Sequence, residues 1–481
     1  MIYFLFAVVY LFLIAIQDKF QGEFVFVIKI IFISLYLVYE IIGERKRNTK
    51  YWRLSPAVLA SLLTFLLSFT LTNLIFLLPG TPLSNWFYNK FGPHPFPILN
   101  KALDLVMFGA FFMWFGYKSK AGDKIFNIVV TKIIDLRKYF RKSFRLNYLV
   151  IVALVLGGIL ARLYAIKIGI FGYSQTPEQV IEYSKISQII NYIEILTQIC
   201  LTAVALAYFS DVKNLKTLVL LILIIMVQIF FGILSGMKSN VVMPALILFV
   251  SYLVVNNRVN KALLLASGIL IFVAYMIIQP FRDFRNMDRN YQSDPSYIIN
   301  TVVDAYNYKG YLTTGEQNTE SIFYSFISRM NYITDASRAI EYKDQIGLME
   351  SDPDFADRLY TTPFQALIPR AVWTSKPEEN IGNWFNTKVW NRPIGTSVAM
   401  SPFGFLYFAG GYTFVVLFFF IFGIMQKLLL NFLKFGPGGA IIFISLLSSV
   451  VLLNSSVNSI FVSWIRNLPI LIILQHYMLK K

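Results

Sequence analysis

The chain has 481 residues, of which 57% are hydrophobic and only 14% charged, and its mean hydropathy is +0.60. Soluble domains are about 45–50% apolar and about 25% charged, so the composition excludes a soluble multidomain protein and predicts an all-α polytopic membrane protein. The net charge of +17 is also typical of basic cytoplasmic loops, so it does not imply a nucleic acid partner. One cysteine and two histidines exclude disulfide frameworks and Cys- or His-rich metal sites.

About twelve runs are apolar enough to be membrane-spanning helices, which need about 17–25 residues. The predicted spans are 2–17, 24–42, 55–79, 102–117, 147–168, 188–210, 214–235, 240–256, 261–280, 402–426, 438–454 and 458–478. The first run lacks a small-residue cleavage site and is closely followed by the second, so we expect a retained helix and not a signal peptide. One large loop of short helices, 281–401, separates membrane domains at 1–280 and 402–481.

The distribution of lysine and arginine predicts the orientation, because short positively charged loops stay in the cytoplasm. With the N-terminus inside, the cytoplasmic loops and adjoining span ends carry 22 basic residues, against seven in the short loops of the other side. Both termini are therefore expected in the cytoplasm. The large loop is expected outside, and its residues 281–400 carry fifteen acidic and twelve basic side chains.

Residues 124–146 combine apolar and basic positions at helical spacing. The apolar positions are Phe126, Val129, Val130, Ile133, Phe140 and Phe144, and Lys132, Arg137, Lys138, Arg141 and Lys142 lie between them. The pattern predicts a basic amphipathic helix on the anionic cytoplasmic leaflet, where it would serve as a surface anchor.

Two cations lie at the outer ends of predicted spans. Arg162 is near the end of the fifth span, and Lys238 lies in the tight turn 235–240 between the seventh and eighth. Charge at this depth is costly unless it faces a cavity or a charged partner, so both residues are candidate ligands for an anion. Snorkelling of the side chains to the interface is the alternative.

The large loop opens with Phe281-Arg282-Asp283-Phe284-Arg285. Arg282 and Arg285 are three residues apart, so on a helix both guanidinium groups would emerge on one face at headgroup height. Such a pair suits a phosphate or pyrophosphate, which arginine can bind through two hydrogen bonds. Snorkelling, or pairing with Asp283, is an equal alternative.

A second group of charged residues follows on a stretch with helical spacing, 328–338. Arg329 and Asp335 could both approach a site there. For Arg338 we expect a structural ion pair.

The most specific segment is Ile368-Pro369-Arg370-Ala371-Val372-Trp373-Thr374-Ser375-Lys376-Pro377. Its two prolines restrict the backbone, so Arg370 and Lys376 should be held near defined positions. Three of the seven tryptophans, Trp373, Trp384 and Trp390, fall within eighteen residues. Aromatic faces beside donors such as Asn380 suit a sugar, although tryptophans also anchor loops in the membrane interface.

Nucleotide and metal motifs are missing from the sequence. There is no G-x-x-x-x-G-K-[ST], no G-x-G-x-x-G after a strand, no H-E-x-x-H and no C-x-x-C. No cofactor and no metal ion is therefore expected.

The segment Ile368-Pro369-Arg370, Trp373, Lys376-Pro377 and Gly382 resembles the Ile-Pro-Arg…Trp-Pro-x-Lys-Pro…Gly pattern of Wzy-type O-antigen and oligosaccharide repeat-unit polymerases. The number of spans, the loop before the last three, Ser235-Gly236-x-Lys238, and Thr396-Ser397 ahead of Gly404-x-Leu406-Tyr407 agree with that family. The specific motif covers about fifteen residues, whereas the similarity in architecture covers most of the chain. Where many members carry Gly-Glu before Leu-Tyr, this chain has Gly404-Phe405, so an acid that is catalytic elsewhere would be missing here.

The resemblance implies a GT-C-like glycosyltransferase of the bacterial cytoplasmic (inner) membrane. It would polymerise polyprenyl-diphosphate-linked repeat units into a surface polysaccharide at the outer face, with undecaprenyl diphosphate as the expected carrier. The lipid-linked glycan would be donor and acceptor, and a chain-length regulator and a flippase are candidate partners. No nucleic acid partner is expected.

The resemblance also gives roles to the candidate residues. Fixed cations would stabilise the leaving pyrophosphate, and these are Arg282, Arg285, Arg329, Arg370, Lys376, Lys238 and Arg162. Asp335 and Asp283 are the candidate bases that would take the proton from the acceptor hydroxyl. Trp373, Trp384 and Asn380 are the candidate sugar-binding residues.

Two other functions remain open. An O-antigen ligase of similar architecture would transfer finished polymer, but such enzymes look to depend on a histidine in the outer loop, and residues 281–400 contain none. A flippase or transporter of lipid-linked oligosaccharides would normally show internal repeats and charged or broken helices near the midplane. No repeat relates the two halves of this sequence, and the candidate charges cluster at the outer face.

Overall fold

The computed structural model describes most of the membrane domain and part of the large loop. The described residues are 2–17, 22–78, 80–92, 95–133, 138–172, 183–210, 214–271, 330–346, 381–391, 400–453 and 457–480, with the single residues 274, 278, 327, 361, 365, 368, 373 and 398.

The described elements are helices in sequence order. They are α1 (Ile2–Ile16), α2 (Gly22–Arg47), α3 (Pro56–Ala60), α4 (Pro82–Phe91), α5 (Phe96–Lys118), α6 (Ala121–Ile125), α7 (Tyr148–Lys167), α9 (Ser184–Phe209), α10 (Leu215–Leu234), α11 (Lys238–Asn256), α15 (Ile333–Ile346), α18 (Ile381–Trp384), α19 (Pro402–Phe432), α20 (Pro437–Val451) and α21 (Val457–Met478). π-helical turns continue α3 over Ser61–Ser68, α6 over Phe126–Ile133 and α18 over Phe385–Val389, and a 3₁₀-helix covers Leu71–Leu77.

Nine helices among the described residues are long and apolar enough to cross a membrane. Each of them falls on a span predicted from the sequence. The other three predicted spans contain shorter apolar helices, which are Phe6–Ile16, Lys261–Ile271 and Pro437–Val451. The chain is therefore an α-helical polytopic membrane protein.

Polar caps followed by proline begin two helices near the large loop. Before α19, the Ser401 hydroxyl accepts a hydrogen bond from the Gly404 N–H at 3.3 Å, and Pro402 occupies the first helical position. Thr81 and Pro82 begin α4 in the same way. The hydroxyl satisfies an amide that has no helical partner, and proline lacks the amide that would otherwise need one.

Helices α5 and α19 form the central pair of the bundle. Glycines on both helices permit a close approach. A Cβ atom at Gly116 of α5 would overlap the carbonyl oxygen of Phe420, and one at Gly423 of α19 would overlap that of Met113. Small residues at such a contact let two membrane helices pack by direct backbone contact.

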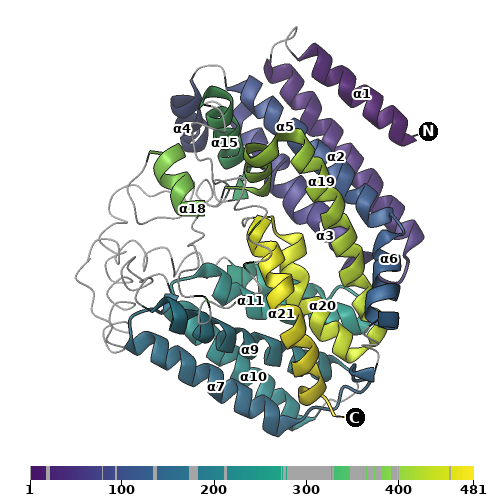
Figure 1. The fold of residues 1–481 in the computed structure, drawn as a ribbon, viewed down its shortest axis with the longest axis vertical. Coiled ribbons are helices and arrows are strands. Elements are labelled where there is room, and N and C mark those ends of the chain that lie inside the picture. The colour runs from purple at the N-terminus through teal and green to yellow at the C-terminus, as the bar shows by residue number, and fades with distance from the viewer. Residues whose placement is uncertain are drawn as a thin grey trace.

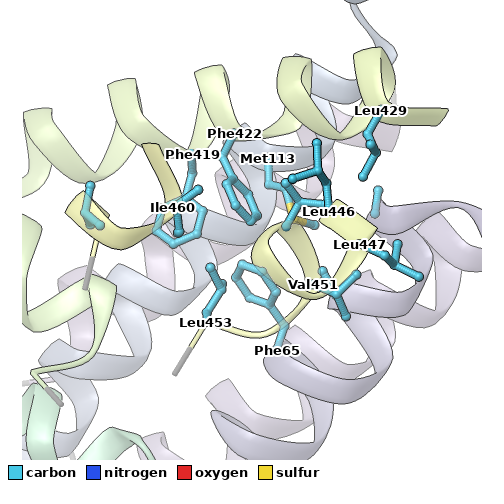
Figure 2. Close-up of a cluster of buried hydrophobic side chains, with 14 of the residues drawn as sticks. Phe65, Met113, Phe419, Phe422, Leu429, Leu446, Leu447, Val451, Leu453 and Ile460 are labelled. Atoms are coloured by element: carbon cyan, nitrogen blue, oxygen red, sulfur yellow. The ribbon is translucent and has the colours of Figure 1, made fainter. Parts of the chain in front are cut away.

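The core continues from this pair toward the last two helices. Figure 2 shows buried side chains of this core, which come from α5, the Ser61–Ser68 turn, α19, α20, the residues directly after α20, and α21. They are Phe65, Met113, Phe419, Phe422, Leu429, Leu446, Leu447, Val451, Leu453 and Ile460. Lipid tails are as apolar as leucine, so contacts inside a membrane stabilise the fold through close packing and dispersion.

The two ends of the bundle differ (Figure 1). Helices α4, α15 and α18 lie at one end, which we call the loop end. At the other end, the C-terminal ends of α2, α5 and α19 lie near α6. We call it the basic end, because it carries Arg45, Lys46, Arg47, Lys118, Lys427 and Lys434.

The helix predicted over 124–146 differs from the structure in its second half. The helical part is described only to Ile133, and residues 141–147 are not helical. Leu146 instead forms an isolated antiparallel bridge with Leu479. The backbone of this half hydrogen-bonds to the end of the chain, a contact that the amphipathic pattern does not predict.

Candidate functional site

The structure describes five of the twelve residues predicted to form the functional site. They are Arg162, Lys238, Asp335, Trp373 and Trp384. The other seven lie outside the described residues: Arg282, Asp283, Arg285, Arg329, Arg370, Lys376 and Asn380. The roles of these seven therefore stay predictions.

Asp335 lies half-buried in the first turn of α15, a helix of the large loop that packs against α5 and α19. The packed face of α15 is apolar and fully buried, and it consists of Ile333, Ala336, Ala339 and Ile340. On α19, a Cβ atom at Gly404 would lie only 2.9 Å from the Ala339 Cβ. Small residues on both helices thus bring the charged side chains of α15 close to the membrane bundle.

The start of α15 is fixed by buried amide side chains. Asn331 Nδ2 donates to Asn73 Oδ1 at 2.8 Å, which joins α15 to the segment after α3. Asn331 Oδ1 in turn accepts hydrogen bonds from the Thr334 backbone N–H at 3.3 Å and from its hydroxyl at 2.9 Å. A buried amide with several hydrogen bonds defines one orientation of the helix.

Four side chains from α5, α15 and α19 form what we call the loop-end cluster: Lys101, Lys343, Asp344 and Tyr407. Lys101 Nζ lies 2.5 Å from Asp344 Oδ2, and the Tyr407 hydroxyl donates to Asp344 Oδ1 at 2.9 Å. Both ammonium groups lie near the Tyr407 ring, with distances to its centroid of 4.9 Å for Lys101 and 4.5 Å for Lys343. The cluster has two cations and one carboxylate, and the Lys101 side chain is 31% exposed.

A break in α19 lies beside this cluster. Gly410 has φ −164° and ψ 18°, and Gly411 has φ 68° and ψ −154°, a left-handed φ that favours glycine. The carbonyl of Tyr407, four residues before Gly411, accepts a hydrogen bond from the Lys343 ammonium. Burial lowers the pKa of Lys343 below its usual value, and the adjacent Asp344 opposes that shift. Lys343 thus joins α15 to the first half of α19.

Arg338 has the structural role expected of it. Its Nε and Nη2 donate to the Val389 carbonyl at 3.2 and 3.1 Å, and its Nη1 pairs with Glu341. The guanidinium also lies 5.8 Å from the centroid of a Trp390 ring. Arg338 therefore connects α15 to the π-helical turn after α18.

Trp384 belongs to an aromatic group between α15, α18 and α19. Its ring centroid lies 5.3 Å from that of Phe408 and 6.4 Å from that of Tyr342, both in edge-to-face geometry. Trp384 is half-buried, and Tyr342 directly precedes Lys343 of the loop-end cluster. Trp373 is also half-buried. Trp384 thus packs against aromatic side chains of α15 and α19, the helices that carry Lys343 and Tyr407.

Arg162 and Lys238 lie among α7, α9, α10 and α11, and no described contact joins them to the loop-end cluster. Arg162 is only 5% exposed, and its Nη2 donates to Thr197 Oγ1 at 2.9 Å and to Gln228 Oε1 at 3.1 Å. Its Nη1 has no hydrogen-bond partner among the described residues. Lys238 is half-buried at the first position of α11.

Sequence reasoning missed the loop-end cluster and a buried ion pair close to it. Lys29 Nζ of α2 lies 2.6 Å from Asp104 Oδ1 of α5, with side chains 0% and 3% exposed. The Tyr10 hydroxyl of α1 also donates to Asp104 Oδ1, at 2.9 Å. A lysine and an aspartate inside apolar spans are a signal that could have revealed this pair. No comparable signal separates the residues of the loop-end cluster from other charges.

A family model described as a domain of unknown function (DUF8712) matches residues 159–481, which are 323 of the 481 residues. The chain belongs to this family. No curated protein and no solved structure matches this chain. The DUF8712 region contains Lys343, Asp344 and Tyr407, whereas Lys101 precedes it. The loop-end cluster thus combines residues from the DUF8712 region with one from the part of the chain before it.

Proposed function

We propose that this chain is an integral-membrane glycosyltransferase. It polymerises polyprenyl-diphosphate-linked oligosaccharide repeat units at the outer face of the bacterial cytoplasmic membrane. The observation that carries the proposal is the loop-end cluster, in which α15 of the large loop contributes one lysine and one carboxylate beside the lysine of α5 and the tyrosine of α19. The resemblance of Ile368–Gly382 to the Wzy-type motif gives the substrate class.

In this proposal the chain crosses the membrane twelve times and both termini are cytoplasmic. The nine long apolar helices and the three shorter ones support this number. The basic end then faces the cytoplasm, in agreement with the positive-inside rule. The loop end faces outward, where the lipid-linked repeat units would be presented.

The reaction joins an acceptor hydroxyl oxygen to the anomeric carbon of the donor sugar and breaks the bond from that carbon to the diphosphate. Lys101 and Lys343 stabilise the negative charge of the departing lipid diphosphate, together with Arg370 of the motif. Asp344 positions Lys101 through their ion pair, and Asp335 takes the proton from the acceptor hydroxyl. Cations that are already held in place stabilise developing charge without reorganisation.

The glycan itself is recognised by aromatic and amide groups in this proposal. Trp384, half-buried beside Tyr342 and Phe408, offers a face for the apolar side of a sugar ring. Trp373 and Asn380 of the motif add a second aromatic face and hydrogen bonds to hydroxyls.

Substitution of Arg370 tests this function. Arg370→Ala should abolish long polymer while the amount of protein in the membrane stays unchanged. Arg370→Lys should fail as well, because an ammonium cannot form the two parallel hydrogen bonds that a guanidinium makes to a phosphate. Normal polymer length in either variant, measured on cells that express it, would contradict the role of Arg370.

Transport of lipid-linked oligosaccharides is the second candidate, and the structure adds an observation in its favour. Transporters use broken helices and buried charges within the membrane. Here α19 is broken at Gly410–Gly411, and Lys29, Asp104 and Arg162 are buried within membrane-spanning helices. Protein in sealed vesicles separates the two functions, because a transporter moves the labelled lipid-linked unit across the bilayer without lengthening it.

A further inference from the structure

A basic pocket lies at the end of the bundle opposite the loop-end cluster. It has a volume of about 350 Å³ and lies where α2, α5 and α19 end near α6. Its charged lining consists of four cations, Arg47, Lys118, Lys427 and Lys434, and two carboxylates, Glu44 and Asp123. Cations therefore exceed carboxylates by two.

The carboxylates of the pocket are already satisfied by neutral donors. Glu44 Oε1 accepts hydrogen bonds from the Tyr117 hydroxyl at 3.0 Å and from Asn48 Nδ2 at 3.3 Å. Asp123 Oδ1 accepts one from Asn431 Nδ2 at 2.9 Å, and Lys434 Nζ lies farther from it, at 3.8 Å. Neither carboxylate is thus paired closely with a lysine of the pocket.

Next to the pocket, the fully buried carboxylate of Glu40 neutralises one of these cations and lies at the limit of ion-pair distance from a second. Lys118 forms an ion pair with Glu40, and Arg47 Nη2 lies 3.9 Å from the same carboxylate. Both cations are also the last residues of their helices, where the partial negative charge of a helix C-terminus attracts them.

Lys427 has none of these partners. No carboxylate among the described residues lies within ion-pair distance of it. It precedes the end of α19 by more than one turn, beyond the range over which a helix terminus stabilises charge. Its stem packs against α6, where a Cβ atom at Gly122 would lie 2.8 Å from the Lys427 Cβ. Its ammonium lies 5.2 Å from the centroid of the Tyr117 ring.

We propose that this pocket binds a phosphate ester group, with Lys427 as its central ligand and Arg47 and Lys434 at its rim. An anion there neutralises the excess positive charge, and lysine and arginine are the side chains that bind phosphate. The pocket lies at helix ends, at the level of lipid headgroups, and basic pockets between membrane helices are suited to acidic headgroups. This site is independent of the proposed polymerisation, because it lies at the other end of α5 and α19.

Ligand-dependent thermal stability of the purified full-length protein in detergent tests the site. The probes are phosphatidylglycerol, phosphatidylcholine and inorganic phosphate at constant ionic strength. The variants are Lys427→Gln, the conservative Lys427→Arg, and Lys216→Gln as a control that removes an exposed lysine from α10. A ligand that binds only the folded protein raises the unfolding temperature, so each shift measures occupancy of the site.

We expect phosphatidylglycerol to raise the unfolding temperature of the wild type and of Lys216→Gln by the same amount. In Lys427→Gln the shift should fall to less than half, and Lys427→Arg should keep most of it. A shift with inorganic phosphate that Lys427→Gln also loses would show that the site accepts phosphate without a lipid attached. Equal shifts in Lys427→Gln and Lys216→Gln, or equal stabilisation by phosphatidylcholine, would overturn the proposal.

Discussion

Helices α5 and α19 lie near lysines at both of their ends, and the two ends hold those lysines differently. At the loop end, Lys101 is paired with Asp344, and Lys343 donates to a backbone carbonyl. At the basic end, Lys118 is paired with Glu40, whereas Lys427 has no carboxylate partner among the described residues. A cation held by a partner within the protein keeps a fixed position, and a fixed cation can stabilise charge that develops in a transition state. A cation without one is available to an external anion.

The largest effect is expected in the membrane interior between these ends, where Lys29 and Asp104 are almost completely buried. Asp104→Asn leaves the Lys29 charge without its partner and should lower the free energy of unfolding by about 3–5 kcal/mol. The double variant Lys29→Met, Asp104→Leu removes both charges and should recover most of that loss. Unfolding in detergent measures both, and a double variant as unstable as Asp104→Asn would show that the pair itself stabilises the fold.

Lys101→Gln addresses the loop end. If this lysine stabilises the leaving diphosphate, polymerisation should fall by about 10²-fold or more, the effect of removing one such group elsewhere. The free energy of unfolding should change by less than about 1 kcal/mol, because the Lys101–Asp344 pair is partly exposed. Lys388→Gln removes an exposed cation after α18 and is the matched control. Equal turnover in the two variants would remove Lys101 from the mechanism.

The close contact between α5 and α19, the two helices that connect the loop end and the basic end, is tested at Gly116. Gly116→Ala inserts a methyl group against the Phe420 carbonyl and should destabilise the protein by about 1–3 kcal/mol through overpacking. Gly157→Ala on α7 is the control, because a methyl group there would have no neighbouring atom within 4 Å. A similar unfolding temperature for both variants would show that the α5–α19 contact is loose enough to accept a methyl group.

The smallest effect is expected at the cap of α19. Ser401→Ala removes the hydroxyl that accepts the Gly404 amide hydrogen bond and should cost about 1 kcal/mol. Ser401→Thr keeps a hydroxyl acceptor at this buried position and should stay closer to the wild type. Equal losses in the two variants would mean that packing, and not the cap, determines the start of α19.

Hydropathy predicted the membrane helices well, because a segment of about 20 apolar residues has few alternatives to a helix in lipid. The structural role of Arg338 was also predicted, although its partner, Glu341, was not. The loop-end cluster could not be predicted, because Lys101 and Asp344 are 243 positions apart. Only the docking of α15 on α5 and α19 brings them together, and the helical pattern of α15 does not specify its neighbours. The Lys29–Asp104 pair was predictable in kind, since two opposite charges inside apolar spans need each other.

Turnover of a labelled polyprenyl-diphosphate-linked repeat unit by the purified full-length protein tests the central claim most directly. The protein is reconstituted into vesicles without nucleotide sugar, and the length of the lipid-linked product is measured with Arg370→Lys as the comparison. The proposed function predicts products of two or more units with release of polyprenyl diphosphate, and little or no lengthening by the variant. Movement of the unit across the bilayer without any lengthening by the wild type would contradict polymerisation and favour transport.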